Sequence, residues 1–107
     1  MNAKCKEIVE MLKISKKTIA CMESCTGGYL ANEITNISGA SEVLKVSLVT
    51  YSNEYKIKFG VNKQTIDKYT VYSIETAEEM AKTVSDFASS DYGIGITRQL
   101  RRNWRCK

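Results

Sequence analysis

The chain has 107 residues, of which 43% are hydrophobic and 26% are charged, so it predicts one globular domain and excludes a disordered or fibrous chain. It contains no histidine, which excludes a serine–histidine–aspartate triad and removes most zinc sites. We therefore expect no metal and no cofactor, and a catalytic base would have to be Lys, Tyr, Asp or Glu. No apolar run approaches the ~20 residues of a membrane span, and the charged N-terminus lacks a signal-peptide core. We expect a cytoplasmic protein that binds no membrane.

The net charge of +4 is unevenly distributed. Residues 98–107 contain all four arginines, one lysine and no acid, whereas residues 1–97 contain 11 lysines and 12 acids. This abrupt change predicts either a basic interaction arm or a non-native end, such as a shifted reading frame. The total charge is therefore poor evidence for nucleic-acid binding, and we expect none.

The four cysteines are spaced as neither a disulfide framework nor a CxxC pair, so we expect reduced thiols. They are Cys5, Cys21, Cys25 and Cys106.

The first half of the chain predicts a helix, a strand, a turn, a second helix and a second strand. Helical spacing of apolar residues predicts an amphipathic helix over residues 4–12. A short apolar run over 18–22 is typical of a buried strand, and a polar turn over 23–28 follows it. Helical spacing then resumes over 30–37. Residues 43–51 are rich in β-branched side chains and predict a second strand.

The second half predicts three capped helices and a third strand. Ser52, Asn62 and Ser73 are suitable N-caps for helices over 53–58, 63–68 and from 74 onward. The long third helix should bury one apolar stripe, and Gly60 should end the first. The stripe consists of Ile74, Ala77, Met80, Ala81, Val84, Phe87 and Ala88.

Residues 92–97 predict the third strand, in which Gly93 and Gly95 suggest close packing or close approach of a ligand. Alternating helices and apolar strands predict a layered α/β domain with a largely parallel sheet. Ligands bind such sheets at the carboxyl ends of the strands. Ser24, Tyr51 and Thr97 should all lie there.

The turn at 23–28 could form an oxyanion site. Backbone N–H groups of Thr26, Gly27 and Gly28 would face a ligand at the start of the following helix, where the Ser24 hydroxyl could attack a carbonyl carbon. Ordinary helix capping and a simple glycine turn explain the same residues. Cys25 is a rival nucleophile, although no base can be identified for it.

Lys56 is the candidate base. It follows the second strand and lies in the first turns of a helix, where the positive potential and partial burial would both disfavour its ammonium form. A neutral amine could accept the proton of Ser24. A solvated surface lysine remains the alternative. Tyr51 could orient Lys56, relay a proton or contact the substrate, and Glu23 and Glu54 could tune Lys56 or be surface carboxylates.

Four segments together resemble the C-terminal domain of the CinA family: Glu23-Ser24-Cys25-Thr26-Gly27-Gly28, Thr50-Tyr51-Ser52-Asn53-Glu54 with Lys56, Ser73 before Glu75-Thr76-Ala77, and Gly93-Ile94-Gly95-Ile96-Thr97. The resemblance implies a three-layer α/β/α sandwich with a mainly parallel sheet. It also implies a serine/lysine amidase that converts nicotinamide mononucleotide to nicotinate mononucleotide and ammonia. Ser24 would be the nucleophile, Lys56 the base, Tyr51 an active-site partner and Thr97 a substrate-side residue.

The resemblance stops at Thr97, where the family continues with a glycine- and proline-rich loop and further strands. We therefore expect residues 1–97 to form an incomplete amidase domain that lacks the last strands, and 98–107 to form a basic tail. Weak or lost activity is expected, and an unpaired sheet edge would favour a homo-oligomer. The alternatives are a non-catalytic nucleotide-binding or regulatory module, and a nucleic-acid binder that uses the tail.

Overall fold

The computed structural model describes residues 3–98. Residues 99–107, with most of the predicted basic tail and Cys106, lie outside the described part of the chain. The elements, in chain order, are α1 (Ala3–Ser15), β1 (Ile19–Glu23), α2 (Tyr29–Thr35), a short 3₁₀ helix (Ala40–Glu42), β2 (Leu44–Val49), α3 (Asn53–Phe59), α4 (Lys63–Tyr69), α5 (Ile74–Ala88) and β3 (Tyr92–Ile96). Every helix and strand predicted above is present, whereas the 3₁₀ helix was not anticipated. No described helix is both long and apolar enough to cross a membrane.

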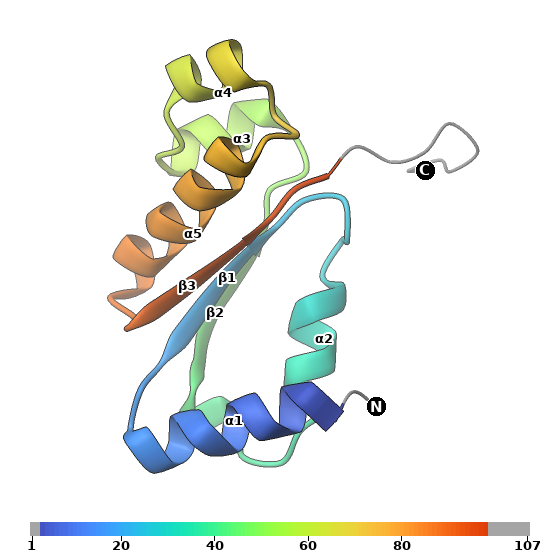
Figure 1. The fold of residues 1–107 in the computed structure, drawn as a ribbon, viewed down its shortest axis with the longest axis vertical. Helices are drawn as coiled ribbons and strands as arrows, with labels where there is room; N and C mark the ends of the chain where they lie inside the picture. The colour runs from blue at the N-terminus through green and yellow to red at the C-terminus, as the bar shows by residue number, and fades with distance from the viewer. Residues whose placement is uncertain (1–2, 99–107) are drawn as a thin grey trace, which may run out of the picture.

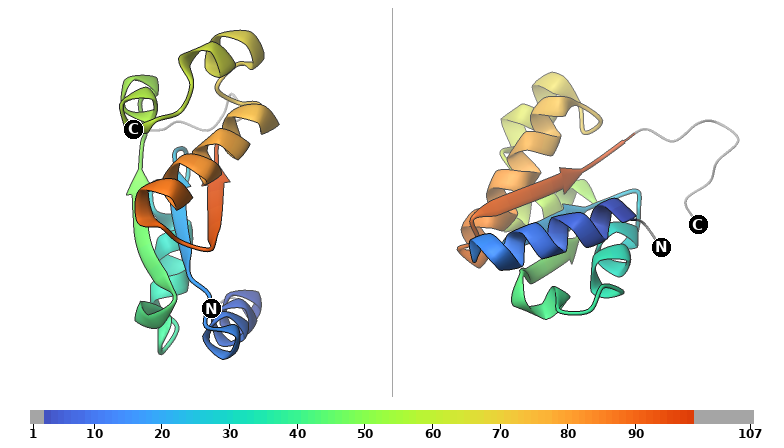
Figure 2. Two further views of the ribbon diagram at one scale, coloured as in Figure 1. Left: turned by 90° about the vertical axis from the view of Figure 1, so that its left-hand side faces the viewer. Right: turned by 60° about the horizontal axis from the view of Figure 1, so that its bottom comes forward.

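The three strands form one parallel sheet in the order β2-β1-β3, which confirms the predicted fold class. Helices α1 and α2 lie on one face of the sheet and α5 lies on the other, with α3 and α4 on the α5 side near the carboxyl ends of the strands (Figure 1). The further views show the same three layers, with the sheet between the two sets of helices (Figure 2). Because β1 lies between β2 and β3, it is the central strand, and all five of its residues are buried.

Alternation along β1 divides its side chains between two cores. Ile19 and Cys21 pack with α1, α2 and the segment before β2, whereas Ala20 and Met22 pack with α5 and α4. This two-sided burial explains why the strand is a continuous apolar run instead of an alternating one. It also holds the last residue of the strand, Glu23, in a fixed position.

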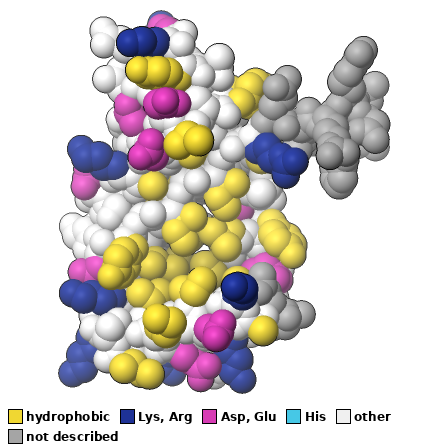
Figure 3. All heavy atoms as spheres, viewed as in Figure 1, with side chains coloured by type: hydrophobic (Ala, Val, Ile, Leu, Met, Phe, Trp, Pro, Cys, Tyr) yellow, Lys and Arg dark blue, Asp and Glu magenta, His cyan; other side chains and the backbone are white. Residues whose placement is uncertain are grey.

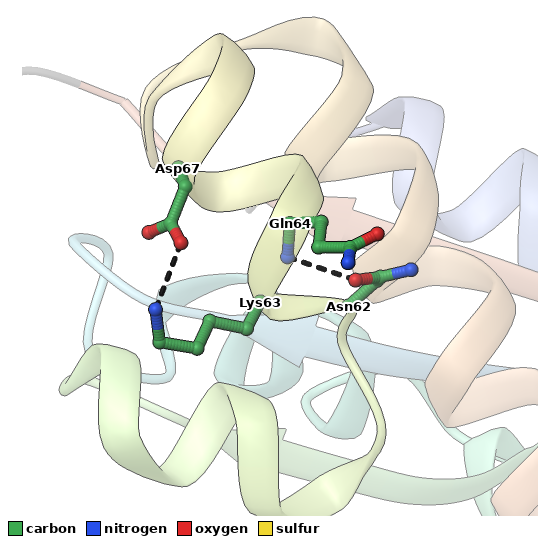
Figure 4. Close-up of polar contacts among 4 residues, drawn as sticks. All are labelled: Asn62, Lys63, Gln64 and Asp67. Carbon is green, nitrogen blue, oxygen red and sulfur yellow. Dashed lines mark hydrogen bonds and ion pairs between the residues drawn. The ribbon is translucent and has the colours of Figure 1, made fainter.

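The three predicted N-caps are confirmed. The side-chain oxygens of Ser52, Asn62 and Ser73 accept hydrogen bonds from backbone N–H groups in the first turns of α3, α4 and α5. Figure 4 shows the cap of α4, in which Asn62 Oδ1 accepts from the N–H of Gln64 at 2.8 Å. An ion pair between Lys63 and Asp67 spans the next turn.

The glycines of β3 allow α5 to pack closely against the strand. A Cβ atom added at Gly93 would lie 2.0 Å from the carbonyl oxygen of Ala81, and one at Gly95 would lie 2.1 Å from that of Ala77. Close packing, one of the two explanations offered by the sequence, therefore accounts for both residues.

The far edge of β3 is open in the described part of the chain, because β3 pairs only with β1. Apolar side chains gather across the middle of this side of the molecule, between α5 and α1 (Figure 3). Ile8, Met11 and Tyr92, each about half exposed or more, line a hollow here with Leu12 and Ser15.

The predicted stripe of α5 is wrong at two positions. Ile74 and Phe87 are 76% and 58% exposed, whereas Thr76 is buried with Met80 and Val84. Ile74 is the first residue of the helix and lies beyond the sheet that α5 covers. Phe87 instead makes an edge-to-face contact with Phe59.

Candidate active site

The register of the sheet brings three sequence-distant segments together. Glu23 pairs with Val49 of β2 on one side and with Ile96 of β3 on the other. The residues that follow these three, Ser24, Thr50 and Thr97, therefore leave the sheet side by side at its carboxyl edge. Ser24 and Thr97 therefore lie at this edge as predicted, and Tyr51 follows one residue after Thr50.

Ser24 and Lys56 are in direct contact. Lys56 Nζ lies 3.0 Å from Ser24 Oγ, although 32 residues separate them in the sequence. Lys56 reaches this position because α3 begins close to the end of β2 and points the side chain back toward β1. Lys56 is only 1% exposed and Ser24 only 8% exposed, so the contact is shielded from water. The alternative of a solvated surface lysine is therefore wrong.

Two backbone carbonyl groups orient the Lys56 side chain. Besides Ser24, Nζ donates to the carbonyl oxygen of Thr50 at 2.7 Å and to that of Tyr51 at 3.4 Å. An ammonium group has three N–H donors, so all three acceptors are matched. A neutral amine would keep two N–H groups for the two carbonyl oxygens and direct its lone pair at the Ser24 hydroxyl. The geometry thus suits both protonation states.

Burial lowers the pKa of Lys56 below its ordinary value of 10.5, and an electrostatic interaction with Cys25 opposes this effect in part. Desolvation disfavours the charged ammonium, so it increases the fraction of neutral amine at a given pH. A lysine with a lowered pKa in hydrogen-bond contact with a serine hydroxyl is a chemically competent base.

Tyr51 and Thr97 follow β2 and β3, and their predicted roles toward a substrate stay predictions. The side chain of Tyr51 is 58% exposed, and its contact with Lys56 is made by the backbone carbonyl. The Thr97 hydroxyl donates to the carbonyl oxygen of Val71 at 2.9 Å, which ties the end of β3 to the segment before α5.

The turn after β1 is held by internal hydrogen bonds. Gly27 and Gly28 have φ values of 62° and 101°, which glycine adopts without strain. The N–H of Gly27 donates to the carbonyl oxygen of Ser24 at 3.1 Å, so it is engaged within the turn. The N–H groups of Cys25, Thr26 and Gly28 remain the candidates for binding a substrate oxygen.

The two glutamates near the site differ from each other. Glu54 is exposed and forms an ion pair with Lys58, which fits a surface carboxylate. Glu23 is fully buried, and its carboxylate binds Thr26 and the first turn of α2 instead of Lys56. The surface position considered for Glu23 from the sequence is therefore wrong. An effect of its charge on Lys56 stays a prediction.

The described cysteines are free thiols, as predicted. Burial, and to a smaller extent the charge of Glu23, raises the pKa of Cys21 to about 12, so this thiol stays protonated and unreactive. Cys25 is partly exposed beside Ser24, but Lys56 points at the serine oxygen. The geometry favours Ser24 as the nucleophile.

Comparisons with known proteins agree with this fold. The family model "CinA C-terminal domain" matches residues 2–98. The chain belongs to the CinA C-terminal domain family. A "competence-damage inducible protein" from Thermoanaerobacter sp. (strain X514) is 47% identical over 84% of this chain, and a "CinA-like protein" from Kosmotoga olearia is 43% identical over the same share. The chain spans about a fifth of each of these relatives (22%).

Solved CinA-family structures have the same fold. A competence or damage-inducible protein from Enterobacter asburiae superposes with a TM-score of 0.78 at 32% identity, over 81% of this chain and 55% of that one. A competence/damage inducible protein from Agrobacterium tumefaciens gives 0.77 at 30% identity, over 81% and 53%. The chain thus spans about half the length of these CinA proteins.

Proposed function

We propose that this chain carries the nucleophile and base of an amidase that hydrolyses nicotinamide mononucleotide to nicotinate mononucleotide and ammonia. The observation that carries the proposal is the buried 3.0 Å contact between Lys56 Nζ and Ser24 Oγ, since a histidine-free hydrolase needs a base of this kind. The choice of substrate comes from the CinA resemblance, and the reaction class comes from the geometry of the pair.

In the first half-reaction, Ser24 Oγ attacks the carboxamide carbon while neutral Lys56 takes the hydroxyl proton. A C–O bond forms, and the carbonyl electrons move to the oxygen. When the tetrahedral intermediate collapses, the C–N bond breaks and Lys56 returns its proton to the leaving nitrogen, so ammonia departs and an ester to Ser24 remains. Water then attacks the ester with Lys56 again as the base, which releases the carboxylic acid and restores the serine hydroxyl.

The negative oxygen of the intermediate would be bound by N–H groups of the turn after β1. Such a donor is typically worth ~3–4 kcal/mol of transition-state stabilisation. Because Gly27 is engaged within the turn, Cys25, Thr26 and Gly28 are the donors that this role requires.

A second candidate function is a non-catalytic nucleotide-binding or regulatory module. It is favoured by one observation: the hydroxyl of Thr97, which was expected on the substrate side, donates a hydrogen bond to the carbonyl oxygen of Val71. Extending the chain after Thr97 with a family-type continuation tests this alternative. A rise in kcat/KM for nicotinamide mononucleotide would show that the chain has the chemistry but lacks part of the binding site, whereas no turnover by the extended chain would support the module.

The amidase is tested by ammonia release from nicotinamide mononucleotide by the wild type, S24A, K56R and a control, K58R. Lys58 is an exposed lysine two residues from Lys56 and is paired with Glu54. Arginine stays charged at working pH and cannot act as the base, so K56R should lose activity while K58R keeps it. The wild-type rate should rise with pH through the lowered pKa of Lys56, because only the neutral amine accepts a proton.

Unchanged turnover in S24A would remove the serine from the mechanism. An active K56R would make Lys56 a binding cation and would require a different base.

A further inference from the structure

Glu23 is a buried carboxylate that the reaction above does not use. It is the last residue of β1 and is fully buried directly before the nucleophile. Its Oε1 accepts a hydrogen bond from Thr26 Oγ1 at 2.6 Å and from the N–H of Leu30 at 3.1 Å, and its Oε2 accepts from the N–H of Ala31 at 2.9 Å. A single side chain thus connects the end of β1, the turn and the first turn of α2.

These hydrogen bonds take the place of a helix cap. The residue before α2 is Gly28, which has no side chain to bond the first N–H groups of the helix, and no side-chain cap is present there. Glu23 supplies the missing acceptor from outside the helix, and its negative charge suits the positive end of the helix. The turn also has backbone hydrogen bonds from Gly27 to Ser24 and from Tyr29 to Thr26, and Glu23 adds the side-chain contacts that tie its two glycines with positive φ to α2.

We propose that Glu23 is the positioning residue of the nucleophile, which locks the turn over residues 24–28 so that Ser24 Oγ stays in contact with Lys56. This inference rests on the proposed function. Glu23 has a structural role in this proposal, because its three hydrogen bonds go to the turn and to α2. The three contacts of Lys56 go to Ser24, Thr50 and Tyr51.

Three variants separate this role from others. E23Q keeps the shape of the side chain but places an NH2 group against one of its N–H partners, so at least one hydrogen bond is lost. T26V removes the hydroxyl that donates to Glu23 while keeping a β-branched side chain. T35V is its matched control, because the exposed Thr35 hydroxyl donates to the carbonyl oxygen of Asn32 within α2. T26V leaves the carboxylate of Glu23 in place, so it still tests the proposal if E23Q folds poorly.

The main measurement is the rate at which a fluorophosphonate labels Ser24, read by intact mass across a pH series. In this reaction Ser24 Oγ displaces fluoride from phosphorus, and Lys56 takes the hydroxyl proton. We expect E23Q to label roughly 10- to 100-fold more slowly at every pH, because a displacement of about 1 Å costs up to that much. T26V should lose about fivefold, the effect of one hydrogen bond, and T35V should stay near the wild-type rate.

The pH series distinguishes positioning from electrostatic tuning. A positioning role lowers the plateau and leaves the midpoint of the profile in place. A shift of the midpoint with an unchanged plateau would mean that Glu23 acts on the charge of Lys56 and would overturn the proposal. A labelling rate of folded E23Q within twofold of the wild type would also overturn it.

Amide hydrogen exchange gives a readout that does not depend on chemistry. The N–H groups of Leu30 and Ala31 bond directly to the carboxylate, so they should exchange faster in E23Q while the amides of α5 stay protected. Unchanged protection at both amides would refute the positioning role. If wild-type Ser24 is not labelled at all but these amides exchange faster in E23Q, the amidase proposal is wrong. The role of Glu23 in holding the turn is then still supported.

Discussion

Replacing Gly95 with alanine should lower the stability of the domain, because the new methyl group would collide with the backbone of α5. Its Cβ would lie 2.1 Å from the carbonyl oxygen of Ala77, 2.7 Å from the backbone nitrogen of Ala81 and 3.0 Å from Cβ of Met80. Ordinary contact begins near 3.4 Å, so α5 must move away by over an ångström. Gly95 is not among the glycines with positive φ, so alanine can adopt its backbone conformation and only the contact opposes it.

The magnitude follows from two opposing effects. Overpacking of this kind costs about 1–3 kcal/mol, and the upper end applies here because the obstacle is helix backbone instead of a movable side chain. Alanine also lowers the conformational entropy of the unfolded chain relative to glycine, which stabilises the folded state by up to ~1 kcal/mol. The net loss of about 2 kcal/mol corresponds to a decrease in Tm of roughly 8–16 °C for a domain of this size.

Thermal unfolding followed by circular dichroism measures this effect, with urea unfolding as a second probe. G27A is the matched control: a Cβ at Gly27 meets no atom within 4 Å, so its cost is only that of a left-handed alanine, roughly 1–2 kcal/mol. A Tm of G95A within a few degrees of the wild type would refute the close contact between β3 and α5 on which the estimate depends.

The remaining predictions concern pH. Burial lowers the pKa of Lys56 in the folded state, so the unfolded chain binds more protons below pH 10.5. The free energy of unfolding should therefore increase as pH rises toward 10.5. Urea unfolding at pH 7 and pH 9 should show a smaller increase in K56M than in the wild type. A hydrogen bond from the backbone N–H of Thr18 lowers the pKa of Asp91, with some opposition from desolvation and a further contribution from the Thr18 hydroxyl. Asp91 therefore stabilises the fold above its ordinary pKa of 3.8, and that contribution is lost as pH falls through the lower folded value. D91N should show less acid destabilisation than the wild type in thermal melts between pH 6 and pH 3, and equal acid sensitivity would contradict this assignment.

The sequence predicted the elements because their signals are local. The caps at Ser52, Asn62 and Ser73 are set by side chains that bond N–H groups two or three residues away, and the structure has all three. Ser24 could be named because the strand-end rule for parallel sheets and the CinA resemblance both point to it. Lys56 could be named because its place in the first turns of a helix and the same resemblance agree.

The orientation of individual side chains could not be predicted in this way. Whether the Thr97 hydroxyl faces a substrate or the Val71 carbonyl depends on a segment 26 residues away. The role of Glu23 was missed because an acid at the end of a strand suggests exposure. The available signal was its position between a fully apolar strand and a helix that begins after two glycines without a side-chain cap.

The position of β1 in the middle of the sheet has a consequence for protein synthesis. β1, the strand directly before Ser24, is made before both of its neighbours: β2 follows soon after it, but β3 is complete only at Ile96. While the ribosome is translating the segment between them, the central strand of the finished protein is an edge strand, with its apolar faces only partly covered. Such an edge is open to pairing with other chains, so the nascent chain is most prone to aggregation in the interval between the synthesis of β2 and that of β3.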